Sequence, residues 1–169
     1  MATEGLLSVE PRKGYFVRPL TVKRITEAYD VRMGLEFLAI EVITTKQKPL
    51  HLERLEELLH EREATVSGRT IVDRDLYIAT NEAFHNYIID LANNDILSEV
   101  YRKLAVNLLM NRIMYDAKET AGDVGGEHAE MVGALRQRDL ERFRRVCRKH
   151  IETGKKMAQL AIERAGGTL

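Results

Sequence analysis

The pattern of apolar and polar positions changes its period near residue 20. Before this point, two short β-like runs, 6–10 and 15–17, flank the turn-forming stretch Pro11-Arg12-Lys13-Gly14. Glycine accepts the positive φ that a tight turn needs, and Pro19 has no N–H with which to continue strand pairing. The first 19 residues therefore predict a β-hairpin that carries Arg12 and Lys13 at its tip.

From Thr21 onward, apolar residues recur every three to four positions, which is the period of an amphipathic helix. Thr21 and Asp139 can cap the first and last helices through their side-chain oxygens, and Pro49 suits the first position of the second helix. The expected helices cover about residues 22–43, 49–59, 72–92, 97–116, 127–137 and 140–165, with a glycine-rich loop at 121–126. About six helices with short connections predict an all-α, antiparallel bundle that follows the hairpin.

Composition narrows the class of protein. The chain has 169 residues, of which 44% are hydrophobic and 31% charged, and this is typical of one soluble globular domain. Its 26 basic and 26 acidic residues cancel, which argues against a domain that holds nucleic acid by itself. Since no membrane span or export signal is evident, we expect a cytoplasmic protein with no membrane partner. Its one cysteine, Cys147, is expected to be a small buried side chain.

Four polar residues fall on the apolar stripes of the predicted helices. Asn81 and His85 are four residues apart on one helix face, while His128 and His150 lie equally far from the turn at Asp139. Residues equidistant from the turn of an antiparallel hairpin lie at the same height, so His128 and His150 are expected to face each other. Three inward imidazoles and an amide oxygen suit a divalent metal such as zinc or nickel. The alternative is a metal-free helical dimer in which these histidines only pack.

Arg32 and Glu36 form another inward pair, one helical turn apart. They predict either a structural ion pair or an arginine that binds a carboxylate ligand with its planar fork. Because no serine elbow, phosphate loop or dinucleotide loop is present, we do not expect an enzyme. A metal-dependent hydrolytic enzyme stays as the alternative, with Glu36 as the one carboxylate on the stripes that could serve as general base. His51 and His60, which lie among charges, are expected to be solvated.

Two groups of residues resemble known families. The stretch from Glu4-Gly5-Leu6-Leu7 to Arg12-Lys13-Gly14-Tyr15-Phe16-Val17 resembles the wing of a GntR-type winged helix-turn-helix. The rest resembles the FCD (FadR C-terminal) ligand-binding domain, in its shorter VanR-like branch. The positions that carry this second resemblance are Tyr29-Asp30-Val31-Arg32, Leu35-Glu36, Asn81-Glu82-Ala83-Phe84-His85, Asn94, Glu127-His128, Leu135, Asp139 and His150.

The resemblance implies a homodimeric bacterial transcription regulator with a wing remnant at residues 1–19 and an effector-binding domain at 20–169. It places a divalent metal, zinc or else nickel, at Asn81, His85, His128 and His150. A small organic acid would bind beside the metal at Arg32, with its partner Glu36. Arg12 and Lys13 would contact DNA phosphates, but only the full-length protein would bind an operator, because the recognition helix of the family precedes the wing.

One position departs from the family pattern. Asparagine stands at residue 81, where the family usually has aspartate. With asparagine and three neutral histidines, a divalent metal keeps its full double positive charge in a partly dry interior, where Coulomb energies exceed those in water. The substitution therefore predicts a metal that binds weakly alone and more tightly when an acid is present.

Overall fold

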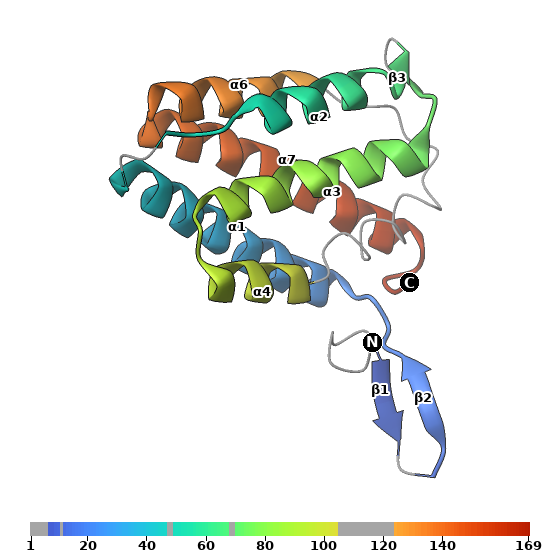
Figure 1. Ribbon diagram of the computed structural model, residues 1–169. Coiled ribbons are helices and arrows are strands. Elements are labelled where there is room, and N and C mark those ends of the chain that lie inside the picture. Colours follow the sequence, from blue (N-terminus) through green and yellow to red (C-terminus); the bar gives the residue numbers. More distant parts are fainter. Residues whose placement is uncertain (1–6, 11, 47–48, 68–69, 105–123) are drawn as a thin grey trace.

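The chain folds into the all-α antiparallel bundle that its sequence predicts. The computed structural model describes residues 7–10, 12–46, 49–67, 70–104 and 124–169 (Figure 1). The helices in this part of the chain are α1 (Val22–Thr45), α2 (Glu53–Glu63), α3 (Arg74–Leu91), α4 (Asp95–Lys103), α6 (Val124–Gln137) and α7 (Leu140–Arg164). The strands form two small hairpins, β1 (Leu7–Glu10) with β2 (Gly14–Val17) and β3 (Val66–Ser67) with β4 (Thr70–Ile71).

The first hairpin confirms the prediction for the start of the chain. Its antiparallel register pairs Leu7 with Val17 and Glu10 with Gly14. Arg12 and Gly14 both take positive φ angles, 66° and 105°, so that the chain reverses within a few residues. The hairpin projects away from the bundle, and Arg12 and Lys13 are exposed near its tip (Figure 1).

The two longest helices, α1 and α7, run antiparallel and pack against each other (Figure 1). Both begin at the predicted caps: the Thr21 side chain accepts a hydrogen bond from Arg24 N–H at 3.2 Å, and the Asp139 side chain accepts one from Arg142 N–H at 2.9 Å. Helix α6 packs on α7 as the other arm of a helical hairpin, α2 packs on α3 and α6, and α4 contacts α3 and α1.

The residues after α7 return to the start of α1. Gly166 and Gly167 take φ angles of 90° and 92°, as expected for glycines that end a helix. Leu20 N–H then donates to the Leu169 carbonyl at 2.8 Å, and Leu169 N–H donates to the Leu20 carbonyl at 3.0 Å. The joint between the first hairpin and the bundle is therefore tied to the end of α7.

The core lies between α1, α3, α6 and α7. Its fully buried side chains include Ile25, Ile40, Phe84, Ile88, Leu135, Phe143 and Ile151. Cys147 is also completely buried, as predicted. Among the helices that the structure describes, none has both the length and the apolar character needed to cross a membrane.

Two predicted boundaries are wrong. Helix α2 begins at Glu53 and not at Pro49: Leu52 is buried before the helix starts, and Glu53 and Glu56 supply the negative charge that a helix N-terminus favours. Helix α6 begins at Val124, so residues 124–126 of the expected glycine-rich loop are helical. Glycine in a helix interior costs about 1 kcal/mol relative to alanine, which is why the sequence favours a loop here.

Two other segments bear on how the predicted elements compare with the observed ones. The fourth predicted helix is present as α4 up to Lys103, and its expected continuation over 105–116 lies outside the described residues. The hairpin β3–β4 between α2 and α3 has no counterpart in the predicted elements. Its residues Val66, Thr70 and Ile71 are β-branched, a composition that favours strands, but strands of two residues leave no periodic pattern.

Candidate metal centre

Three histidines from three helices meet in the interior of the bundle. They are His85 of α3, His128 of α6 and His150 of α7, all buried, and each offers a ring nitrogen within 4.8 Å of the others. The rings of His128 and His150 have centroids 4.5 Å apart. The predicted contact across the α6–α7 hairpin is confirmed, because the turn at Asp139 does place these residues at the same height.

Two of the histidines each have a carboxylate next to their Nδ1 atom. His85 Nδ1 is 3.2 Å from the Glu36 carboxylate, and His150 Nδ1 is 3.1 Å from Glu127 Oε2. Burial alone would raise the pKa of Glu36, but His85 and Arg32 hold it well below the ordinary value. The hydrogen bond from His150 lowers the pKa of Glu127. Both carboxylates are therefore ionised and can only accept, so each facing Nδ1 carries the hydrogen.

The opposite nitrogens of these two rings then carry lone pairs that point at each other. Burial lowers the pKa of His85 to about 3 and also lowers that of His150, so both rings are neutral at pH 7. Their Nε2 atoms are only 3.2 Å apart. Two nitrogens that bind one zinc ion at tetrahedral angles lie about 3.3 Å apart. The arrangement fits a cation held between His85 and His150.

Asn81 completes the set of ligand atoms. It lies one turn before His85 on α3 and is half-buried, and its Oδ1 is 3.1 Å from His128 Nε2. The structure thus brings together all four residues predicted for the metal. Three imidazoles and an amide oxygen, with two imidazoles oriented by carboxylates, form a donor set suited to zinc or nickel.

Glu36 is the centre of a second cluster. Its fully buried carboxylate receives Arg32 Nε and the Tyr101 hydroxyl on Oε1, both at 2.8 Å, and the Cys147 thiol on Oε2 at 3.2 Å, in addition to His85. A carboxylate has about four lone-pair sites, and these four donors fill them. Arg32 and Glu36 thus form the buried ion pair that was one of the two readings of their spacing.

Arg32 keeps one unused donor. Its Nη2 is buried and has no hydrogen-bond partner, a condition that costs a protein about 1–3 kcal/mol per group. Although burial disfavours the charge, interactions with Tyr101 and Glu36 raise the pKa of Arg32, so the guanidinium is always charged. Burial is the main cause of the lowered pKa values of His85 and His150, and the charge of Arg32 adds to it. The charge of Arg32 therefore acts on the histidine cluster.

Sequence reasoning missed four of these contacts, one of which is the contact between His85 and Glu36. Glu127 contacts His150 across the α6–α7 hairpin, and the symmetry about Asp139 that predicted the histidine pair would have found it. Cys147 was expected to pack only as a small apolar side chain, yet its thiol lies against Glu36. The role of Tyr101 depends on how α4 packs against α1, for which the sequence holds no signal.

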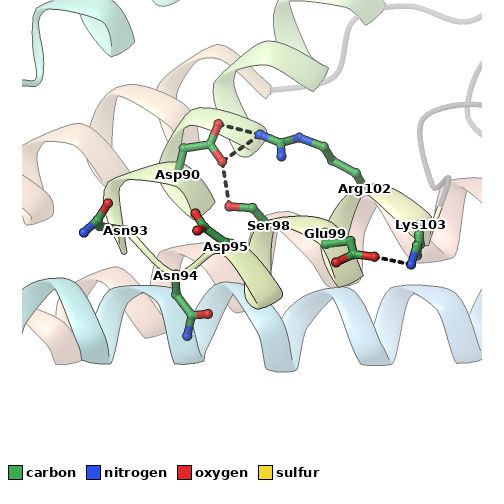
Figure 2. A pocket seen from close by; sticks show the side chains of 8 residues that line it. All are labelled: Asp90, Asn93, Asn94, Asp95, Ser98, Glu99, Arg102 and Lys103. Carbon is green, nitrogen blue, oxygen red and sulfur yellow. Dashed lines mark hydrogen bonds and ion pairs between the residues drawn. The ribbon is translucent and has the colours of Figure 1, made fainter.

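A surface hollow at the α3–α4 corner is separate from the histidine cluster (Figure 2). It encloses about 520 Å³ and is lined by polar and charged side chains, none of which belongs to the predicted sites. Its charged groups pair with one another: Asp90 accepts from Ser98 and Arg102, and Glu99 pairs with Lys103. His51 and His60 are exposed, as predicted, and take no part in the cluster.

Acid should destabilise the metal-free protein. His85 has a pKa of about 3 when folded against an ordinary value of 6.5, so between these values only the unfolded chain binds the proton. The free energy of unfolding should therefore fall as pH drops from 6.5 toward 3, and the lowered pKa of Glu36 adds a loss below 4.5. Urea unfolding with a chelator present, measured across this range, checks the slope. His60→Ala, at an exposed position, should keep the slope; a flat profile in the native chain contradicts a buried neutral His85.

This geometry defines a class of protein: an all-helical bundle that encloses a cluster of residues able to bind a metal. The family model of the FCD domain matches residues 27–153, and the chain belongs to this family. This confirms the resemblance seen in the sequence.

Individual proteins and solved structures that resemble this chain are consistent with this family. The chain is 27% identical to the HTH-type transcriptional regulator YdhC of Bacillus subtilis over 82% of its own length and 61% of that protein. Across several curated relatives, which are transcriptional regulators, it spans 61% to 66% of their length. Its fold resembles E. coli McbR/YncC, with a TM-score of 0.75, 21% identity and coverage of 93% and 74% of the two chains. The metal-free FCD domain of TM0439 gives a TM-score of 0.66 and 16% identity, with 85% and 97% covered.

Proposed function

We propose that this chain is the effector-sensing part of a GntR-type transcription regulator, which binds a small organic acid beside a divalent metal. The observation that carries the proposal is the convergence of ring nitrogens from three buried histidines near a buried arginine with an unused donor. His85, His128, His150 and Asn81 would hold the metal, which is zinc or else nickel. A bound metal would supply a fixed positive charge that attracts a carboxylate, and an acid could add to its coordination where the metal accepts more than four ligands, or could replace Asn81.

Different side chains of the site would bind the metal and the acid. Glu36 and Glu127 orient the rings of His85 and His150, so that their Nε2 lone pairs face the ligand-binding interior. Arg32 Nη2 would donate to the acid, while its Nε stays bonded to Glu36. Glu36 acts through Arg32 and His85 in this arrangement, because an ionised carboxylate only accepts hydrogen bonds and an acid anion has none to donate to it.

The filled lone pairs of Glu36 favour a sensor over the alternative of a hydrolytic enzyme. Glu36 was the general base suggested by the sequence, and here it is fully buried with four donors around it. A base must reach a water or substrate proton within hydrogen-bond distance. The names of the relatives as transcriptional regulators support the same choice.

The remaining parts of the proposal concern the whole regulator. We take residues 1–19 as the end of a winged helix-turn-helix and 20–169 as the sensor, in a homodimer that acts in the cytoplasm. Arg12 and Lys13, exposed near the hairpin tip, would add salt-sensitive contacts to DNA phosphates in the full-length protein. Acid binding would change how the two DNA-binding heads sit on an operator.

Zinc and acid should bind cooperatively. Calorimetric titration would measure zinc affinity with and without a panel of small mono- and dicarboxylic acids, each at a concentration that leaves free zinc unchanged. We expect the best acid to tighten zinc binding roughly tenfold, within the usual range of coupling between two ligands. Asn81→Asp should bind zinc more tightly and depend less on the acid, because it supplies the missing negative charge.

Asn93→Asp is the matched control, since it adds the same charge at an exposed position of the α3–α4 turn. It should behave like the native chain. A native chain that binds neither zinc nor nickel would refute the proposal. If zinc affinity is the same with every acid in native and Asn81→Asp proteins, the charge argument is wrong.

A further inference from the structure

Within the described part of the chain, helix α4 makes polar contacts with α3 and with α1. On one side Ser98 and Arg102, one turn apart, bond to Asp90 of α3 at 2.7 Å each (Figure 2). Tyr101 points elsewhere: it is buried, and its hydroxyl donates to Glu36 of α1. The helix has only nine residues, and helices shorter than about 12–15 residues are marginal on their own, so its stability depends on such contacts.

Tyr101 and His85 share the same acceptor. Both bond to the Glu36 carboxylate, together with Arg32 and Cys147, so one buried group joins α1, α3, α4 and α7. The four donors fill the roughly four lone-pair sites of this carboxylate. Loss of the Tyr101 hydroxyl would leave one site empty and let the carboxylate shift. The residue of the proposed metal set that contacts this carboxylate is His85.

We infer that Tyr101 is a positioning residue for the metal centre: through Glu36 it orients His85, and it thereby ties the stability of α4 to metal binding. The inference rests on the proposed function, since it concerns the regulation of the same site. A metal-bound histidine is oriented and made more basic by the group that accepts its other N–H. When that acceptor is itself fixed by Tyr101, metal binding and the seating of α4 must favour each other.

The coupling has to act in both directions. If a seated α4 strengthens the binding of a metal by some factor, the metal stabilises the seated α4 by the same factor. Opening of α4 therefore reports on the metal centre without any need for catalysis or DNA. Its outer side chains Ile96 and Val100 are exposed, so a change in the seating of α4 would change an accessible apolar surface.

Tyr101→Phe tests the inference, because it removes the hydroxyl and keeps the buried ring. Zinc affinity is measured by competition with a chromophoric chelator on the whole 169-residue chain. We expect affinity to fall roughly 3- to 10-fold, less than the 10- to 100-fold loss that follows removal of a direct partner of a metal-binding histidine. Hydrogen exchange of the α4 amides should slow on zinc addition in the native chain, and much less in Tyr101→Phe.

Tyr77→Phe is the matched control. Tyr77 is also a buried tyrosine, but its hydroxyl bonds to Arg62 at 2.6 Å and not to Glu36. This variant should keep native zinc affinity and native zinc-dependent protection of α4. Native zinc affinity in Tyr101→Phe, or α4 exchange that ignores zinc in the native chain, overturns the inference while leaving the proposed function intact. Absence of zinc binding by the native chain overturns both.

Discussion

Glu36→Gln is expected to reduce the stability of the metal-free protein by about 3–5 kcal/mol, the range found when one partner of a buried ion pair is removed. The side chains of Glu36 and Arg32 are 0% and 4% exposed, so the arginine charge left behind has no water to solvate it. Glutamine keeps the size of the side chain, which excludes a cavity as the cause. Urea unfolding in the presence of a chelator measures the change.

Glu41→Gln on the same helix is the control. Glu41 pairs with Arg144 at 3.1 Å, but these side chains are 56% and 33% exposed, and exposed pairs contribute about 0–1 kcal/mol. Adding Arg32→Met to Glu36→Gln should recover part of the loss, because it removes the unpaired charge. If Glu36→Gln and Glu41→Gln reduce the free energy of unfolding equally, burial does not strengthen the contribution of the Arg32–Glu36 pair.

Removal of one histidine should abolish the stabilisation that zinc gives. A ligand that binds only the folded chain stabilises it by about 2.7 kcal/mol at a free concentration 100 times its Kd. His150→Ala removes a nitrogen 3.2 Å from His85 Nε2, so we expect this gain to be largely lost. The measurement is the difference in thermal midpoint between zinc and chelator, which cancels any change in the basal stability of the variant.

His60→Ala serves as the control for this experiment, because His60 lies exposed on α2. It should keep the full zinc-dependent shift. The metal assignment fails if His150→Ala retains that shift, or if His60→Ala loses it. The second outcome would place the zinc at the surface and leave the three buried histidines as packing residues.

Much of the fold could be predicted because its determinants are local. The helical stripes, the caps at Thr21 and Asp139 and the glycines at 166–167 depend on neighbours within one or two turns. The contact between His128 and His150 was also predictable, since a short turn between two helices fixes which residues stand opposite each other. Local rules failed at the start of α2 and α6, where buried Leu52 and the packing of α6 outweighed proline and glycine signals.

The chemistry of the site was decided by the tertiary structure. Spacing placed Arg32 and Glu36 on one face, but it could not show that Tyr101 and Cys147 would fill the remaining lone pairs of Glu36. The periodicity of apolar residues identified the inward faces of the helices, but it did not show which residues of other helices these faces contact. The neutral state of His85 arises from burial, and burial is a property of the assembled bundle. The sequence by itself determined that Arg32, Glu36 and the three histidines face the core. Only packing between distant helices decided which partners they find, because desolvation and hydrogen bonding depend on groups far apart in the chain.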